Sequence, residues 1–224
     1  MNHKTLPPGY IVRMPLEQEW ERVNLGVGVV RRVAPEMAVS VDTFRSEIVR
    51  RTVSKYGKII VNDITAGEGD EQMFATVAEL DVPYVAMHMR GTPQTMQSKT
   101  EYGDVVAEVV DYLVCRAAEL ERAGVDRDNI ILDPGFGFAK SVEQNYALLA
   151  GLSKLVATGY AVLVGLSRKS MIYKVLNTTA EDSLAGTIAL SWEALRQGAT
   201  ILRVHDVYQA VQIAKIYDKG FRNL

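Results

Sequence analysis

The sequence is poor in cysteine, which limits the chemistry available to the chain. Cys115 is the one cysteine among 224 residues, so neither an intrachain disulfide nor a multi-cysteine metal site can form. Such sparing use of cysteine is typical of proteins in reducing compartments, and it favours a cytoplasmic location. Cys115 lies in a helical pattern without a CxxC partner, so we interpret it as a packing residue.

The sequence also lacks an excess of either charge, and it lacks long apolar runs. The 25 Lys and Arg residues nearly balance the 27 Asp and Glu residues, so bulk electrostatics imply no polyanionic partner. The basic residues follow no nucleic-acid-binding motif. No apolar run reaches the length of a membrane span, and the N-terminus has no signal-peptide core. We therefore expect small-molecule ligands, with neither a nucleic-acid nor a membrane partner.

What the sequence does contain is an alternation of short apolar and longer amphipathic segments. The apolar segments resemble strands buried on both faces of a parallel sheet. The expected strands are Ala38–Val41, Lys58–Asn62, Tyr84–Met87, Ile130–Leu132, Ala161–Val164 and Ile201–Val204. The expected helices are Leu16–Arg32, Phe44–Tyr56, Glu71–Leu80, Tyr102–Ala123, Asn145–Ala157, Glu181–Gln197 and Val207–Asp218. This spacing indicates the βα units of a (β/α)8 barrel or a doubly wound sheet.

The number of strands falls short of a closed barrel, which needs eight. The segment before Ala38 offers one helical pattern and a brief apolar stretch at Tyr10–Val12. The stretch Arg90–Tyr102 is polar and unpatterned, and we expect a long loop there. No linker or low-complexity tract divides the chain. The sequence therefore predicts a single α/β domain, residues 1–224, in which a barrel has six of its eight strands.

The octapeptide Asp133–Lys140, with the sequence DPGFGFAK, directly follows one of the expected strands. Its glycines allow a ligand to approach the backbone closely, and its phenylalanines offer flat faces for stacking. Asp133 would lie at the carboxyl end of a strand, where α/β folds build their sites. The pattern suits a planar, nitrogen-rich ring, and it equally suits a plain strand-to-helix turn capped by an aspartate.

Polar residues occur at the end of every expected strand. They are Asp42; Asn62 and Asp63; His88; Asp133; Ser167, Arg168 and Lys169; and Arg203, His205 and Asp206. One such residue is usually a helix cap or turn former, but the whole set would face one mouth of a barrel. Asp42, Asn62 and Asp133 suit the amino edge of a heterocycle.

The cationic strand ends suit a different part of a ligand. Lys169, Arg203 and His205 could hold a phosphate-type anion, since arginine forks onto phosphate oxygens. His205 taken alone would also fit a core histidine bonded to backbone.

In this order, the strand-end motifs closely resemble those of dihydropteroate synthases. The matching segments are Val39–Thr43, Ile60–Asp63, Met87–Pro93, Asp133–Lys140, Val164–Ser170 and Arg203–Asp206, within a resemblance that runs from near Pro8 to the end of the chain. It implies a (β/α)8 barrel, a homodimer through the last helices and assistance by Mg²⁺. The implied reaction joins 6-hydroxymethyl-7,8-dihydropterin diphosphate to 4-aminobenzoate, which gives 7,8-dihydropteroate and pyrophosphate.

The resemblance also implies a role for each matching residue. The pterin would contact Asp42, Asn62, Asp133, Gly165 and Lys169. The aminobenzoate would contact Phe138, Ser167 and Lys169, and the diphosphate would contact Arg203, His205 and Asn62. Lys169, Arg203 and His205 are then the expected catalytic residues, because the reaction mainly requires stabilisation of charge on the leaving pyrophosphate.

The N-terminal part departs from the family pattern. The family's Asn-Val-Thr-Pro-Asp-Ser-Phe and Glu-Ser-Thr-Arg-Pro-Gly loop types are absent from the sequence. Leu6 and Pro7 stand before Pro8–Tyr10 where threonine and arginine would be expected. The Mg²⁺-linked asparagine belongs to the first of these loops, so we expect no metal ligand in this chain. A fragment or miscalled start, a degenerate paralogue, and a chain completed by a partner are all consistent with this pattern.

We accordingly expect negligible synthase activity and a tendency to self-associate from the isolated chain. Two other function classes stay open. One is a pterin-binding protein without synthase activity, either a remnant or a relative of the methyltetrahydrofolate-corrinoid methyltransferases. The other is a generic phosphate-binding barrel enzyme, which does not account for Asp42, Asn62 and Asp133 together.

Overall fold

Short runs of aliphatic residues form the strands of the computed structural model, which describes residues 14–91 and 95–221. The strands are β1 Ser40–Asp42, β2 Ile60–Asp63, β3 Tyr84–Met87, β4 Ile130–Asp133, β5 Ala161–Val164 and β6 Ile201–Leu202. They form one six-stranded sheet in sequence order. Every neighbouring pair is parallel, which is the arrangement expected of consecutive βα units.

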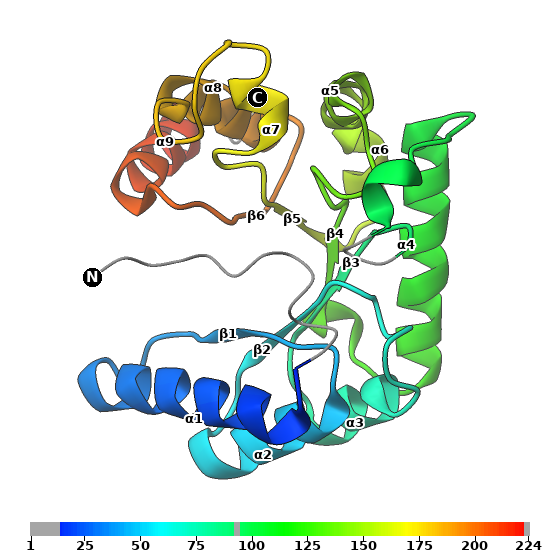
Figure 1. Ribbon diagram of the computed structural model, residues 1–224, viewed down its shortest axis with the longest axis vertical. Coiled ribbons are helices and arrows are strands. Elements are labelled where there is room, and N and C mark those ends of the chain that lie inside the picture. Colours follow the sequence, from blue (N-terminus) through cyan, green and yellow to red (C-terminus); the bar gives the residue numbers. More distant parts are fainter. Residues whose placement is uncertain (1–13, 92–94, 222–224) are drawn as a thin grey trace.

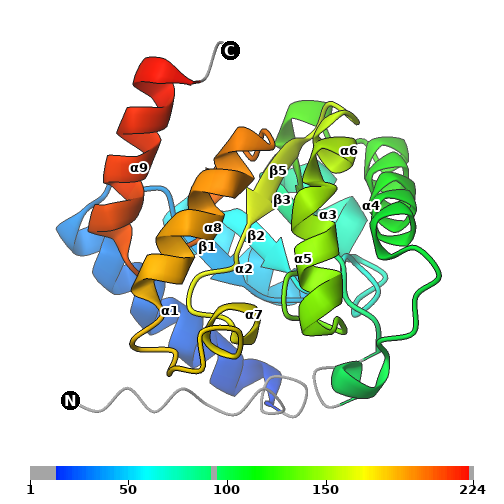
Figure 2. The same cartoon turned by 90° about the horizontal axis from the view of Figure 1, so that it is seen from above.

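Helices connect the strands and cover the convex face of the sheet (Figure 1). They are α1 Leu16–Val33, α2 Ser46–Tyr56, α3 Met73–Leu80, α4 Val105–Arg122, α5 Val142–Ala150, α6 Leu152–Val156, α7 Ser170–Tyr173, α8 Leu184–Arg196 and α9 Val207–Gly220, with short 3₁₀ turns η2 Met96–Ser98 and η3 Arg127–Asn129. Seen from above, α4, α5 and α6 lie side by side along the sheet (Figure 2). Side-chain caps start two of them, from Asp104 on α4 and in a capping box of Ser141 with Gln144 on α5.

Alternation along the strands divides the apolar residues between two faces. The main core lies between sheet and helices and includes Val61, Ala86 and Leu132. A smaller cluster on the concave face contains Val85, Ile131 and Leu163, with Ile60, Ala161 and Ile201 packed against it. This second cluster corresponds to the interior of a barrel, where residues of neighbouring strands stack in layers.

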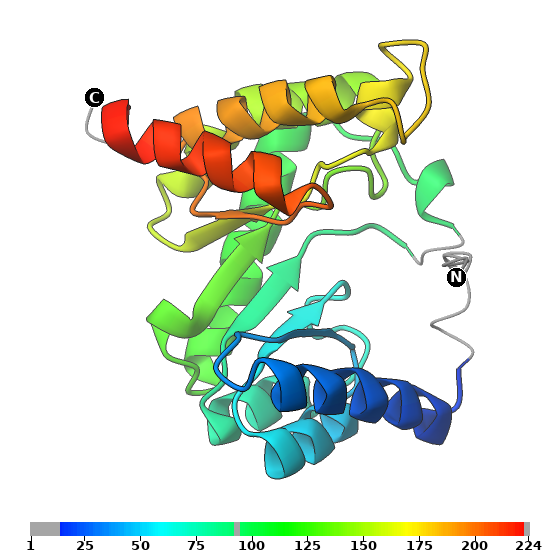
Figure 3. The ribbon, with the colours of Figure 1, turned by 90° about the vertical axis from the view of Figure 1, so that its left-hand side faces the viewer.

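The described strands form an incomplete barrel, with β1 and β6 at the two ends of the sheet. Figure 3 shows α1 and α2 at one end of the curved sheet and α8 and α9 at the other. Apolar side chains of the outermost helices are exposed, including Leu25 and Val33 on α1 and Tyr208 on α9. Among the described residues, no helix is both long enough and apolar enough to cross a membrane.

The observed elements correct several predicted boundaries. The helix expected over Asn145–Ala157 is broken at Gly151, where a Cβ would lie 2.8 Å from a methyl carbon of Val106. The helix expected from Glu181 begins at Leu184, because the hydroxyl of Thr179 accepts a hydrogen bond from the backbone of Asp182 and forms a turn first.

Other differences are smaller. The helix α7 was not predicted, and the loop expected over Arg90–Tyr102 contains η2. Strand β6 ends at Leu202 rather than Val204, although the backbone N–H of Arg203 still donates to the carbonyl of Val164. The apolar stretch Tyr10–Val12 and the residues Leu6 to Tyr10 lie outside the described residues.

Candidate active site

The period of two along each strand decides which polar residues face the concave side. Asn62, Asp133, Gly165 and Arg203 each follow by two positions a member of the concave cluster, respectively Ile60, Ile131, Leu163 and Ile201. Side chains two apart share a face of a sheet, so these residues continue the barrel interior beyond the apolar layer. The carboxyl ends of parallel strands meet at one rim, and the polar residues meet there.

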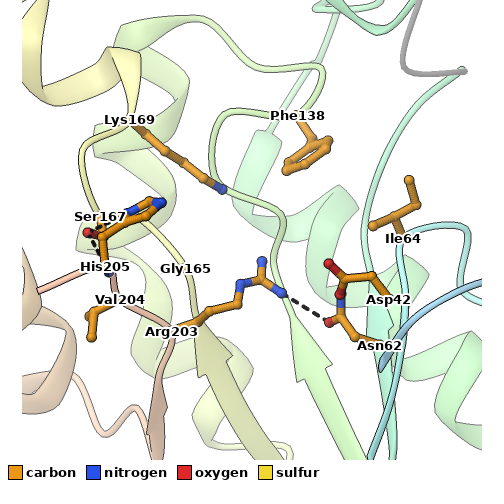
Figure 4. Close-up of a pocket in the computed structure, with 10 residues that line it drawn as sticks. All are labelled: Asp42, Asn62, Ile64, Phe138, Gly165, Ser167, Lys169, Arg203, Val204 and His205. Carbon is orange, nitrogen blue, oxygen red and sulfur yellow. Dashed lines mark hydrogen bonds between the residues drawn. The ribbon is translucent and has the colours of Figure 1, made fainter. Parts of the chain in front are cut away.

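Acidic and amide groups from three strands form one hydrogen-bonded network with an arginine. The Asn62 side-chain amide donates to Asp42 Oδ1 at 2.6 Å. Arg203 donates from Nη1 to Asn62 Oδ1 and from Nη2 to Asp133 Oδ2, each at 3.0 Å. The other oxygen of Asp133 accepts the backbone N–H of Gly135 at 2.8 Å. Every member of this group therefore has a hydrogen-bond partner, and Figure 4 shows the contact of Arg203 with Asn62.

Asp133 is the most buried member of the group. It is 1 % exposed, whereas the side chain of its partner Arg203 is 40 % exposed. The guanidinium therefore lies between Asp133 and the open part of the site. A ligand that pairs with Asp133 Oδ2 therefore competes with this guanidinium.

A second cation, Lys169, reaches the site from the loop after β5. Its ammonium donates to the carbonyl oxygen of Phe136 and lies 4.9 Å from the centre of the Phe138 ring. Burial, partly offset by Asp133, lowers the Lys169 pKa to about 8, so the side chain is mainly protonated at neutral pH. Lys169 and Phe138 thus offer a positive charge and an aromatic face to the same space (Figure 4).

His205 and Ser167 form a pair on the side of the site formed by β5 and β6. His205 Nδ1 lies 3.0 Å from Ser167 Oγ, which also accepts the backbone N–H of His205 at 3.2 Å. His205 is exposed, so the alternative prediction of a core histidine bonded to backbone is wrong. Its ring is available to a ligand of the site.

Arg168, between Ser167 and Lys169, takes a different direction. Its guanidinium forks onto both carboxylate oxygens of Asp206, at 2.9 and 2.8 Å, and donates to the carbonyl of Ala180 at 3.0 Å. Its backbone has a φ of +54°, a left-handed conformation that is uncommon for a residue with a side chain. This turn lets the neighbours Ser167 and Lys169 face the site while Arg168 holds the loop in place.

One pocket of about 300 Å³ unites these groups, a volume at the small end of the range for ligand sites. Its lining is Asp42, Asn62, Ile64, Phe138, Gly165, Ser167, Lys169, Arg203, Val204 and His205 (Figure 4). The structure therefore brings together the residues that were given a ligand contact, with Asp133 lying behind Arg203. Asp63, another strand-end residue expected at the mouth, is instead buried and accepts hydrogen bonds from Thr65, Gly67 and Tyr84. A Cβ at Gly165 would lie 2.8 Å from Arg203 Nη2, so glycine is needed for the arginine to lie there.

Some residues of the site were not predicted to have a role. Ile64 and Val204 line the pocket. Each follows a strand that ends in polar residues, and only those polar residues were predicted to have a role. His88 and Lys140 lie beside it in a buried contact of 3.0 Å between His88 Nδ1 and Lys140 Nζ. Both belong to motifs visible in the sequence, but their separation by 52 positions hides the contact.

Comparison with known proteins agrees with this geometry. Residues 5–205 match the model of the pterin binding enzyme family. The chain belongs to this family.

Its relatives are dihydropteroate synthases. The Escherichia coli K12 enzyme is 40 % identical over 205 residues, which cover 91 % of this chain and 71 % of that enzyme. The Xanthomonas albilineans dihydropteroate synthase in complex with 7,8-dihydropteroate is 38 % identical, with a TM-score of 0.82, over 92 % of this chain and 75 % of that one. The Thermus thermophilus enzyme in complex with 4-aminobenzoate is 37 % identical, with a TM-score of 0.85, over 93 % of this chain and 79 % of that one.

Proposed function

We propose that this chain carries the substrate site of a dihydropteroate synthase-type transferase. The observation that supports it is the meeting of Asp42 and Asn62 with Lys169, Arg203 and His205 in a single pocket, with Asp133 bonded to Arg203 behind it. Carboxylate and amide groups complement the amino and ring N–H groups of a pterin, and the cations complement a diphosphate. The relatives include dihydropteroate synthases with bound 7,8-dihydropteroate and bound 4-aminobenzoate.

In this proposal the pterin binds to the acidic side of the pocket. Asp133 accepts from the amino-pyrimidine edge, with Asn62 and Asp42 beside it, and Gly165 lets the ring approach the backbone. Arg203 already occupies Asp133 and Asn62. It therefore transfers from these two groups to the incoming diphosphate, so that the cation is exchanged between anions and is never left unpaired.

The chemical step requires little proton transfer from the protein. The aminobenzoate nitrogen forms a bond to the pterin methylene carbon, and the bond from that carbon to the diphosphate oxygen breaks. The electron pair leaves with pyrophosphate, and the amine loses a proton. Arg203, His205 and Lys169 supply positive charge near the leaving group, while Phe138, Ser167 and Lys169 line the aminobenzoate position.

The described part of the chain offers no cluster of protein ligands that would fit the expected Mg²⁺. No group of three or more His, Cys, Asp or Glu side chains is placed to hold a metal in residues 14–91 and 95–221. We therefore derive no step through the ion, and the cations named above are the charges that the chain itself supplies.

The test combines binding with turnover on the purified chain. We expect calorimetry to detect 6-hydroxymethyl-7,8-dihydropterin diphosphate, and we expect Asp133→Ala to weaken that binding by about 2–3 kcal/mol. Pyrophosphate release that requires both substrates, however slow, supports the transferase. We expect a rate well below the roughly 1–1000 per second of ordinary enzymes. An absence of pterin binding would contradict the proposal.

A non-catalytic pterin-binding protein is the second candidate. The same contacts support it, because they can hold a pterin without any turnover. The two candidates predict the same pterin affinity but differ in turnover. Binding of the diphosphate substrate with no pyrophosphate release, even at high enzyme concentration, would identify this second function.

We also propose that the chain forms a homodimer through its last helix. Helix α9 exposes Tyr208 by 72 %, Val211 by 45 % and Ile216 by 59 %, and apolar side chains gathered on one element favour a protein contact. Light scattering should give twice the chain mass, and Ile216→Arg should give the single-chain mass. A monomeric wild-type chain would contradict the proposal.

We further propose a cytoplasmic location. The support is the single cysteine, which is free, as is usual in reducing compartments. Its side chain is exposed, so the interpretation of Cys115 as a packing residue is wrong. Cell fractionation against a periplasmic or secreted marker tests it.

A further inference from the structure

Lys140, the last residue of the DPGFGFAK motif, is a buried lysine with no role in the proposed chemistry. It is 4 % exposed. Its ammonium lies 3.0 Å from His88 Nδ1 and donates to the carbonyl oxygens of Gly135 at 3.1 Å and Phe138 at 3.0 Å. An ammonium has three N–H donors, and three acceptors surround it here. No carboxylate is among them, so Lys140 is saturated by neutral groups.

His88 is the partner that joins this lysine to the sheet. Burial, together with the charge of Lys140, lowers the His88 pKa to about 3, so the imidazole is neutral and Nδ1 can accept. The backbone N–H of His88 donates to the carbonyl of Asp133 at 2.9 Å. Lys140 therefore ties the loop after β4 to the end of β3.

The turn that Lys140 holds is the one that faces the pocket. Gly135 and Gly137 have φ values of +68° and +80°, and the Gly137 N–H donates to Asn145 Oδ1 at 2.7 Å. On the pocket side, the Phe136 carbonyl accepts from Lys169, and the Phe138 ring lines the cavity. Two ammonium groups thus donate to carbonyls of this turn, that of the buried Lys140 and that of Lys169 in the pocket.

We infer that Lys140 is a positioning residue that holds the Gly135–Phe138 turn so that the Phe138 ring faces the aminobenzoate position. This inference rests on the proposed function. Without Lys140 the Phe138 carbonyl loses its ammonium donor, and the Gly135 carbonyl keeps only the backbone N–H of Phe138. The turn then relaxes, since a buried carbonyl without a partner is unfavourable. The Phe138 ring moves away from the aminobenzoate, while the pterin contacts of β1, β2 and β4 stay in place.

The test compares two ligands that differ by the aminobenzoate part. Calorimetry at pH 6, below the Lys140 pKa of about 7, measures 6-hydroxymethyl-7,8-dihydropterin and 7,8-dihydropteroate on the wild-type chain and on Lys140→Met. We expect dihydropteroate to bind about tenfold more weakly to the variant, as for loss of a hydrogen bond to a charged group. We expect the bare pterin to change by less than about threefold. Equal losses for both ligands would overturn the inference, because they indicate general damage to the fold.

A double-mutant cycle with Phe138→Ala shows whether Lys140 acts through the ring. If it does, adding Lys140→Met to Phe138→Ala changes dihydropteroate affinity by less than about twofold. Additive losses would overturn the inference, and so would a wild-type chain that binds dihydropteroate no more tightly than the pterin. A wild-type chain that binds neither ligand contradicts the proposed function itself.

Two further variants guard against misfolding. His88→Leu removes one acceptor and leaves Lys140 in place, so it should show the same ligand selectivity with a smaller loss of about threefold. If Lys140→Met does not fold, an unchanged affinity ratio in His88→Leu overturns the inference. Lys154→Met is the matched control, because Lys154 is an exposed lysine on α6, and neither affinity should change.

Discussion

Replacement of Arg203 by alanine should affect two closely related ligands in opposite directions. Arg203 donates to Asn62 and Asp133, so in the proposed function it competes with the pterin for these groups and binds the diphosphate. We expect Arg203→Ala to bind 6-hydroxymethyl-7,8-dihydropterin more tightly and its diphosphate more weakly. A residue that merely stabilises the pocket would weaken both.

The magnitude follows from the two contacts of 3.0 Å that the pterin must break. Because the arginine side chain is 40 % exposed, solvent screens them, and together they contribute about 1–2 kcal/mol. At about 1.4 kcal/mol per tenfold, the variant should bind the pterin alcohol roughly 5- to 30-fold more tightly.

Binding of the diphosphate to the variant also lacks the charge-assisted pair between Arg203 and the diphosphate, worth about 2–3 kcal/mol. The preference for diphosphate over alcohol should therefore fall by roughly 30- to 150-fold. Calorimetry at fixed pH and salt gives both affinities. The control is Arg127→Ala, since Arg127 is a half-exposed arginine paired with Glu121 at 3.0 Å and lies in η3 before β4, away from the pocket. An equal weakening of both ligands would refute the reasoning.

Three more predictions concern the neighbours of this arginine. Asp133→Ala should weaken pterin binding by about 2–3 kcal/mol, and unchanged affinity by calorimetry would contradict the assignment. Gly165→Ala should displace Arg203, because its Cβ would lie 2.8 Å from Nη2. It should lower affinity for the pterin diphosphate at least about tenfold and leave the unfolding free energy within about 1 kcal/mol, as urea titration can check. Burial lowers the Lys140 pKa from 10.5 to about 7 in the fold, so from pH 7 to 8 the unfolded chain holds a proton that the folded chain loses. Stability should then rise with pH by up to about 1.4 kcal/mol per unit, and Lys140→Met should remove this rise in urea titrations, leaving that due to Lys169 at higher pH.

Much of the fold and the membership of the site were predictable from local pattern. The runs at Tyr84–Met87 and Ala161–Val164 have the observed bounds of β3 and β5, because a strand buried on both faces is apolar throughout. Residues an even number of positions apart along a strand then lie on the same face of the sheet. Asn62 and Asp133 were therefore assignable to one rim before any contact was known.

Other features depend on contacts between distant segments. The break at Gly151 coincides with the close approach of Val106 on α4, a contact that no pattern within Asn145–Ala157 contains. The start of α8 also depends on such contacts, because a turn at Thr179 comes first and the helix begins only at Leu184. A local signal identifies a helix, but packing decides where it starts and stops.

The partners of the charged groups also required the tertiary structure. Three consecutive residues after β5 are polar, yet the left-handed backbone of Arg168 turns it to Asp206 while Lys169 faces the pocket. Residue types and spacing determined which groups reach the rim, because periodicity is a property of the strand. The pairing of Arg203 with Asp133, 70 positions apart, was decided only by the curvature of the sheet, which sets the distances between the ends of its strands.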